Sequence, residues 1–275
     1  AIDREREAEH FATRTLLGVR PLPGGSGGGP LVELQVPLIL PADPPGEARW
    51  EALAGPYGTL TESGLVSAVR ALGGRCRRLP FGLGPADAPR ERLAALAGAA
   101  VEAARSGATV LILDDRLLVP HQAAPLDPHL ALAWVDRALR QAREGAFSLR
   151  RQVGLVLASG ALRNLHDIML ALGLGADAVL PSLLWAGAAS AARGPANVLA
   201  ALRKGMEKVL STLGIHDVRG YRRAAAAVGL SQELAEILDV PVFGGRVSGG
   251  WDLEAFARQA RERWSRFQTG EPSRP

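Results

Sequence analysis

Two continuous apolar runs in the middle of the chain limit its fold more than any other feature. Residues 109–113 read Thr-Val-Leu-Ile-Leu and residues 153–157 read Val-Gly-Leu-Val-Leu, without the polar alternation of a half-exposed strand. Runs of this kind are typical of strands buried on both faces, as in a parallel sheet covered by helices. A shorter apolar run over 176–180 is expected to be a further strand.

Helical patterns separate these runs. Residues 90–106 are rich in Ala, Leu, Glu and Arg and end at Gly107, a residue suited to the left-handed conformation that ends many helices. Residues 129–144 and 164–172 have similar patterns. Helix–strand alternation with short glycine-containing connections predicts right-handed βαβ units and a parallel sheet. We therefore expect an α/β fold whose βα core is formed by 89–185.

The segments on either side of this core are less regular. The first 20 or so residues have helical spacing of Ala8, Phe11 and Leu16. We predict a single domain with the following parts: an irregular N-terminal part over 1–88 that contains a strand at 31–36 and a helix at 61–72, a helical part over 196–267, and a frayed tail at 268–275. Within the helical part we predict helices at 196–213, 218–228, 231–238 and 252–267. Because this last third leaves few strands for closure, we expect an incomplete barrel at most.

Charge and cysteine content exclude several classes of function. The net charge is +4, but the arginines are scattered among Glu and Asp along the predicted helices, which does not favour nucleic-acid binding. The one cysteine, Cys76, excludes an internal disulfide, a cysteine zinc site and a cysteine-ligated iron–sulfur cluster within one chain, and we predict no metal site. It is flanked by arginines that could activate a thiol, although an incidental cysteine is favoured.

No apolar run approaches the ~18 residues that a membrane span needs. The charged start of the chain has no apolar signal region, so we expect a cytoplasmic protein without membrane contact.

Polar residues follow two of the predicted strands, where ligands of parallel sheets bind. The first group is Asp114, Asp115 and Arg116. The aspartates could bind a divalent cation, but Arg116 favours capping and ion pairing. The second group is Ser159, Gly160 and Arg163, in the turn after 153–157.

This second turn, followed by a helix and Leu-Gly-Leu-Gly-Ala-Asp-Ala-Val, resembles the final two βα units of FMN-binding (β/α) barrels. In those enzymes the turn and the next helix start hold the flavin phosphate, and the resemblance assigns that role to Ser159, Gly160 and Arg163. Asn164 replaces a second glycine, and Pro181-Ser182 follows the last strand in place of a phosphate loop. Barrel-like ancestry without a ligand is therefore the favoured alternative. The chain has no Gly-x-Ser-x-Gly, P-loop or dinucleotide fingerprint.

A longer stretch, 202–222, carries a second resemblance. It resembles the end of the central domain of the glutamate synthase large subunit, which reads Lys-Gly-x-x-Lys, then Ser, Gly-Ile and Tyr in order. The matching residues are Lys204, Gly205, Lys208, Ser211, Gly214, Ile215 and Tyr221. Further landmarks in the family's order are Asp115 and Arg116 after their strand, 153–177, 243–250 and Arg-Glu-Ala-Glu-His near the start. The resemblance spans almost the whole chain.

The resemblance implies a domain that lies between a glutamine amidotransferase domain and an FMN synthase domain. The whole enzyme hydrolyses glutamine, channels ammonia and reduces 2-iminoglutarate to glutamate. The amidotransferase uses an N-terminal cysteine, whereas position 1 here is Ala. FMN and the iron–sulfur cluster would belong to the neighbouring synthase domain, so no cofactor is expected in this chain. The family's Glu before Ser-Gly is Ala158 here, and its His-His pair is His166-Asp167.

The sequence thus predicts a non-catalytic central domain that works by domain–domain packing. Two alternatives remain open. One is a barrel-like enzyme that binds a flavin or phosphate ligand at 159–163. The other is a stand-alone homologue that acts as a protein–protein adaptor outside glutamate metabolism.

Overall fold

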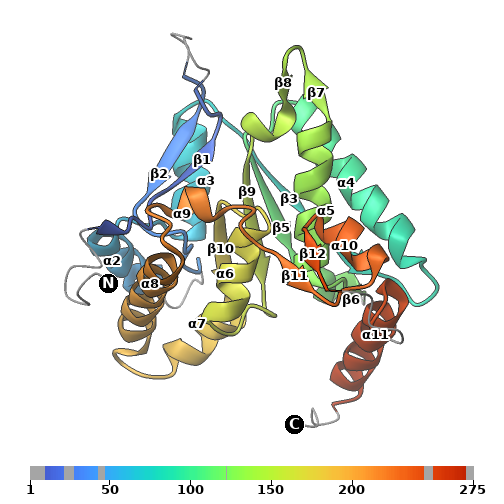
Figure 1. The fold of residues 1–275 in the computed structure, drawn as a ribbon. Coiled ribbons are helices and arrows are strands. Elements are labelled where there is room, and N and C mark those ends of the chain that lie inside the picture. Colours follow the sequence, from blue (N-terminus) through green and yellow to red (C-terminus); the bar gives the residue numbers. More distant parts are fainter. Residues whose placement is uncertain (1–9, 22–27, 43–46, 122, 245–249, 271–275) are drawn as a thin grey trace.

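The computed structural model describes residues 10–21, 28–42, 47–121, 123–244 and 250–270. Its centre is a four-stranded parallel sheet in the order β10–β9–β5–β3. The strands are β3 (Cys76–Leu79), β5 (Val110–Asp114), β9 (Gly154–Ser159) and β10 (Ala178–Pro181). Helices α4 (Pro89–Arg105), α5 (Pro128–Gln141) and α6 (Leu165–Gly173) connect them in chain order (Figure 1). The predicted α/β class and its βα units are confirmed, and within the described residues the sheet stays open.

The first 88 residues contribute more to this body than the predicted irregular segment. Strand β3 is one of the two edge strands of the main sheet, so the βα core begins before residue 89. Helix α3 (Glu62–Ala71) begins where expected, with Thr61 accepting a hydrogen bond from the amide of Gly64 at 3.0 Å. Helix α2 (Glu47–Tyr57) precedes it.

The predicted helix at the start of the chain is wrong for 15–18. These residues form β1 (Thr15–Gly18), which pairs antiparallel with β2 (Leu31–Leu34), the predicted strand near 31–36. Strand β1 crosses the start of β9 so closely that a Cβ on Gly154 would lie 2.8 Å from the Gly18 amide nitrogen. Tertiary packing on the sheet therefore overrides the helical spacing. Residues 1–9 and 245–249, which carry two of the family landmarks, lie outside the described residues.

Alternating side chains of the sheet enter two separate cores. Val110, Ile112 and Val156 face Leu65 and Val69 of α3, together with the β1–β2 hairpin. The opposite side chains enter the larger core with α4, α5 and α6. They are Leu111, Leu113, Leu155, Leu157 and Val179. The sheet is thus the middle of three layers, which explains why its strands read as unbroken apolar runs.

The last third is mostly helical, apart from two short strands. Its helices are α7 (Ser182–Ala189), α8 (Gly194–Leu213), α9 (Val218–Tyr221), α10 (Gln232–Leu238) and α11 (Leu253–Thr269). The helix predicted over 218–228 ends at Tyr221, and the chain continues into β11 (Ala227–Val228), which pairs with β12 (Val242–Phe243). Helix α7 was not predicted, and α11 extends into the expected tail. None of the described helices has both the length and the apolar character required to cross a bilayer.

Candidate functional site

The carboxyl end of the sheet carries a cluster of two arginines and two acids. Asp114, the last residue of β5, is fully buried. Its carboxylate accepts hydrogen bonds from Arg116 (Nε–Oδ1 2.8 Å, Nη2–Oδ2 2.7 Å) and from Arg78 Nη1 at 3.0 Å. Arg116 also holds Glu62, at the start of α3, with Nη2–Oε1 at 2.7 Å and Nη1–Oε2 at 3.0 Å. Arg116 therefore clamps α3 to the end of β5.

This pairing decides the ionisation of the cluster. Burial alone would raise the pKa of Asp114, but the hydrogen bonds and charge of Arg116, with help from Arg78, lower the pKa below its ordinary value. Burial would lower the pKa of Arg116, and the carboxylates of Asp114 and Glu62 raise it. Each charge is matched by a neighbour, which is the capping and ion-pair arrangement rather than an open cation site. The described residues contain no group of three or more His, Cys, Asp or Glu placed to hold a metal ion.

The structure brings Asp115 and the predicted turn together. The Ser159 hydroxyl donates to Asp115 Oδ2 at 2.5 Å, and the Gly160 amide donates to the same oxygen at 3.1 Å. The amide of Ala161 donates to Ser159 Oγ at 3.1 Å. Burial raises the pKa of Asp115, an effect that the hydrogen bonds from Ser159 and Gly160 only partly offset.

The turn's donors are engaged by the protein itself. The Arg163 amide donates to Asp167 Oδ2 at 2.9 Å, and the Arg163 side chain is exposed. Asn164 caps α6 by accepting from the Asp167 amide at 3.0 Å. A flavin phosphate would have to displace the carboxylate of Asp115 from the Gly160 amide. The residues of this turn therefore do not fit a phosphate group, and the geometry gives the flavin alternative no support.

The amino end of the sheet holds a second, larger network that the sequence reasoning missed. Arg150 and Asp177 are both buried, and Arg150 Nη2 lies 2.9 Å from Asp177 Oδ2. Arg150 Nε also donates to Asp136 Oδ1 of α5 at 2.7 Å, and its remaining contacts go to the carbonyls of Val153 and Gly175, each at 2.7 Å. One guanidinium thus ties α5, β9 and the start of β10 together.

Four more arginines surround this buried core. Arg20 and Arg222 both donate to Asp177 Oδ1, Arg20 at 2.7 Å. The other two bind the opposite side of the network. Arg140 Nε lies 2.9 Å from Asp136 Oδ2, Arg223 Nη1 lies 2.6 Å from the same oxygen, and both arginines also bind Asp239. The only local signal in the sequence is an Asp at the start of an apolar strand, in Gly-Ala-Asp-Ala, whose partners are distant in the chain.

The remaining family-motif residues lie on α8, at its end, and on α9, where Tyr221 directly precedes Arg222 of the second network. Lys204 and Lys208 are exposed on α8, and Ser211 is partly buried on the same helix. Gly214 ends this helix at φ 70°, a left-handed backbone that favours glycine. The ring of Tyr221 packs on Gly173 of α6, where a Cβ would lie 3.2 Å from Tyr221 Cε1. Gly214 therefore ends a helix, and Tyr221 packs α9 against α6.

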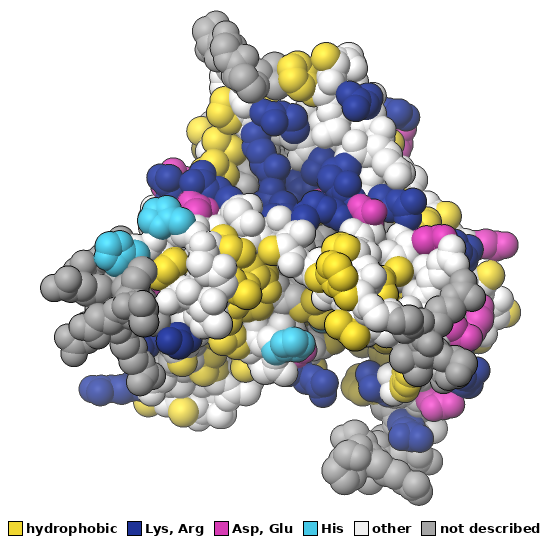
Figure 2. Space-filling view, in the orientation of Figure 1, with side chains coloured by type: hydrophobic (Ala, Val, Ile, Leu, Met, Phe, Trp, Pro, Cys, Tyr) yellow, Lys and Arg dark blue, Asp and Glu magenta, His cyan; other side chains and the backbone are white. Residues whose placement is uncertain are grey.

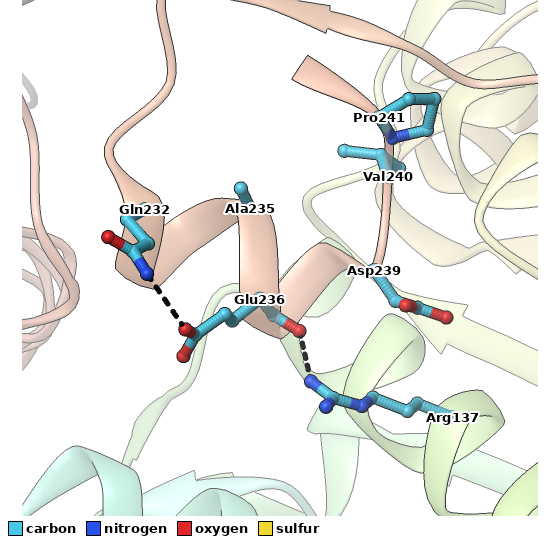
Figure 3. Close-up of a pocket in the computed structure, with 7 residues that line it drawn as sticks. All are labelled: Arg137, Gln232, Ala235, Glu236, Asp239, Val240 and Pro241. Atoms are coloured by element: carbon cyan, nitrogen blue, oxygen red, sulfur yellow. Dashed lines mark hydrogen bonds between the residues drawn. The ribbon is translucent and has the colours of Figure 1, made fainter. Parts of the chain in front are cut away.

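A hollow of about 500 Å³ lies between α5 and α10 and is drawn in Figure 3. Its lining residues are Arg137, Gln232, Ala235, Glu236, Asp239, Val240 and Pro241. Arg137 donates to the backbone carbonyl of Glu236 there. Cys76 lies in β3, half-buried, and burial raises the pKa of its thiol despite the nearby arginines, which disfavours an activated thiolate.

Comparison with known proteins identifies the family. A sequence model of the glutamate synthase central domain matches residues 1–231. The chain belongs to the glutamate synthase central domain family. The large chain of glutamate synthase [NADPH] from Bacillus subtilis (strain 168) is 30% identical over 178 residues, which cover 60% of this chain and 11% of that protein. This member of the central domain family thus matches only a small part of the relative's length.

Solved structures similar to this central domain include two oxidases. A variant mandelate oxidase is 15% identical, covers 80% of this chain and 88% of its own, and has a TM-score of 0.44. A putative lactate oxidase from Pediococcus acidilactici is 14% identical, covers 81% of this chain and 85% of its own, and has a TM-score of 0.45.

Proposed function

We propose that this chain is a non-catalytic coupling domain of glutamate synthase. It would pack between the glutamine amidotransferase domain and the FMN synthase domain, and so support glutamate synthesis from glutamine and 2-oxoglutarate. FMN and the iron–sulfur cluster would be held by the synthase domain. The family match over 1–231 supports this role, and so does the engagement of both polar clusters in internal ion pairs.

The observation that carries the packing role is an exposed apolar pair on β11 and β12. Val228 is 80% exposed and Phe243 is 62% exposed. The two residues are register partners in parallel strands, so their side chains point to the same face, and a Cβ on the adjacent Gly244 would lie 3.5 Å from Val228 Cγ1. Large apolar side chains grouped in this way are typical of a surface that another protein covers.

The described part of the last third exposes further apolar surface. Figure 2 shows hydrophobic side chains where β11 and β12 lie in Figure 1, directly below a basic area. Trp251, before α11, is 50% exposed, and its ring contacts Phe256 at 5.2 Å between centroids. An apolar centre beside charged residues is the usual composition of a domain interface.

A binding experiment tests the proposal. The chain would be mixed with separately produced amidotransferase and FMN synthase domains of a glutamate synthase, and complex formation measured by analytical ultracentrifugation. We expect a complex with at least one of them, and we expect Val228→Ser with Phe243→Ser to weaken it at least about tenfold, because hot-spot residues carry most of the affinity. Leu72→Ser, which removes another half-exposed apolar side chain at the end of α3, is the matched control. Absence of any complex, or equal loss in the control, would refute the packing role.

A further inference from the structure

The arginine network at the amino end of the sheet contains more positive than negative charge. Five arginines (Arg20, Arg140, Arg150, Arg222 and Arg223) contact three aspartates (Asp136, Asp177 and Asp239), which leaves two positive charges in excess. The excess is not spread evenly. Arg140 and Arg223 bind both Asp136 and Asp239, and Arg150 binds Asp136 as well as Asp177. Arg20 and Arg222 have Asp177 as their one acidic partner among the described residues, and they share it with Arg150.

The excess charge lies beside an open cleft. A hollow of about 540 Å³ is lined by Leu16, Arg20, Pro21, Asp217, Arg219, Gly220 and Arg222. Asp217 does not neutralise the cleft, because its carboxylate is bound by Arg219 through Nε–Oδ1 at 2.9 Å and Nη2–Oδ2 at 2.6 Å. Figure 2 shows the resulting basic area around a hollow between the β1–β2 hairpin and the β7–β8 hairpin (Arg143–Glu144 and Phe147–Ser148).

Arg151 adds to this basic character. It donates to the backbone carbonyl of Pro21 at 3.0 Å, and its guanidinium lies 5.9 Å from the centroid of the Phe147 ring. Neither partner is an acid, so the charge of Arg151 remains at the edge of the cleft.

Arg222 is the least satisfied member of the network. Its side chain is only 16% exposed, and its buried Nε has no hydrogen-bond partner among the described residues. Burial lowers the pKa of Arg222 to about 10, and although Asp177 opposes this shift, the charges of Arg150 and Arg20 add to it. An arginine with a lowered pKa is held where an additional anion would stabilise it.

We propose that this cleft binds a small oxyanion, the phosphate or carboxylate group of a small ligand, between Arg20 and Arg222. Each of the two arginines gives Nη2 to Asp177, so the ligand's oxygens would accept from the remaining N–H groups of the two guanidiniums, which are charged donors suited to either oxyanion. Leu16 and Pro21, on the wall of the cleft, offer an apolar surface to the rest of the ligand. The site lies at the opposite end of the sheet from Ser159 and does not depend on the packing role proposed above.

Isothermal titration calorimetry with inorganic phosphate and with succinate tests the site. Both titrations use the whole chain at constant ionic strength with chloride as the reference anion. We expect saturable binding of at least one probe. Binding of phosphate alone identifies a phosphoryl group as the ligand chemistry, and binding of succinate alone identifies a carboxylate. Saturable binding of neither probe would overturn the proposal.

Variants separate a specific site from general anion effects. Arg222→Gln leaves Arg20 and Arg150 on Asp177, so the protein is expected to fold, and binding should weaken about tenfold or more because a charge-assisted hydrogen bond is lost. Arg20→Gln gives a second, independent test. Arg163→Gln removes an exposed arginine at the other end of the sheet and should bind as the wild type does. Circular dichroism checks that each variant is folded. Undiminished binding by both folded cleft variants would also overturn the proposal.

Discussion

Arg150 and Asp177 form a fully buried ion pair in which the guanidinium also reaches Asp136, so one side chain neutralises acids from two separate elements. Arg150→Gln leaves Asp177 paired with Arg20 and Arg222 and leaves Asp136 paired with Arg140 and Arg223, but it removes the buried donors to the carbonyls of Val153 and Gly175. Because a buried acceptor without its donor costs about 1–3 kcal/mol, we expect this variant to lower the free energy of unfolding by about 2–5 kcal/mol. Urea unfolding followed by circular dichroism measures this loss. The exposed Arg163→Gln variant should change stability by less than about 0.5 kcal/mol. A loss below about 1 kcal/mol for Arg150→Gln would show that the pair is not structural.

The pH dependence of stability should also report on Asp177. Burial would raise its pKa, but Arg150, Arg222 and Arg20 lower it below the ordinary value of about 3.9. Below that value the unfolded state binds a proton before the folded state does. The stability that Asp177 contributes is therefore present above about pH 4 and is lost as the pH falls through its lowered folded pKa.

The pH dependence of stability that Asp115 contributes has the opposite sign, so Asp115 serves as the control for Asp177. Its raised pKa means that the folded state holds the proton longer, so its contribution is lost as the pH rises through the folded pKa. Unfolding free energies between about pH 3 and pH 5 should fall with acid less steeply in Asp177→Asn and more steeply in Asp115→Asn than in the wild type. Identical slopes in the three proteins would contradict both assignments.

The sheet was predictable because its sequence signal is local. Strands β5 and β9 are buried on both faces, so nearly every position is apolar, and Gly107 follows the end of α4 with a positive φ of 85° just before β5. The meeting of Asp115 with Ser159 also follows from sequence, because the ends of neighbouring parallel strands lie side by side. Their hydrogen bonds could not be predicted, since these depend on rotamers and on the exact turn.

The errors arise where distant contacts override local preference. Ala224–Ala227 has strong helical propensity, yet α9 ends at Tyr221 and Arg223 adopts φ 66°. Tertiary contacts of Arg223 explain this early helix end. The Arg223 guanidinium binds Asp136 and Asp239, and its amide donates to the Gly173 carbonyl at 2.7 Å. Nothing in the sequence around 223 reveals partners that lie far away in the chain.

Substitution by alanine should have opposite effects on stability at two glycines, one at the end of a helix and one within a helix. Gly214 has φ 70° at the end of α8, so Gly214→Ala forces a left-handed alanine and should cost about 1–2 kcal/mol. Gly98 lies within α4, is exposed, and has open space where an alanine Cβ would lie, with no atom within 4 Å, so Gly98→Ala should stabilise by roughly 0.5–1 kcal/mol. Thermal unfolding of both variants measures the two signs. A stabilising Gly214→Ala would contradict the left-handed helix end.

Gly175 should be the least replaceable glycine of the amino-end network. It combines a φ of 124° with close contact, because a Cβ there would lie 2.6 Å from Asp136 Cγ. Asp136 cannot move aside easily, since Arg140, Arg150 and Arg223 all bind its carboxylate. Gly175→Ala therefore adds steric displacement of a buried ion pair to backbone strain, and we expect a loss of about 3 kcal/mol or more.

Comparison with Gly214→Ala and an Asp136→Ala background separate the two contributions to the Gly175 loss. Gly214 has positive φ but open space around its Cβ position, so its alanine variant measures backbone strain without a clash. Urea unfolding should show a clearly larger loss for Gly175→Ala than for Gly214→Ala, because φ 124° strains an alanine more than φ 70° does and because Asp136 is displaced. The excess should shrink in an Asp136→Ala background, because the obstructing carboxylate is then absent. Equal losses in the two glycine variants would mean that Asp136 yields freely, and the amino-end network would then be looser than its contacts imply.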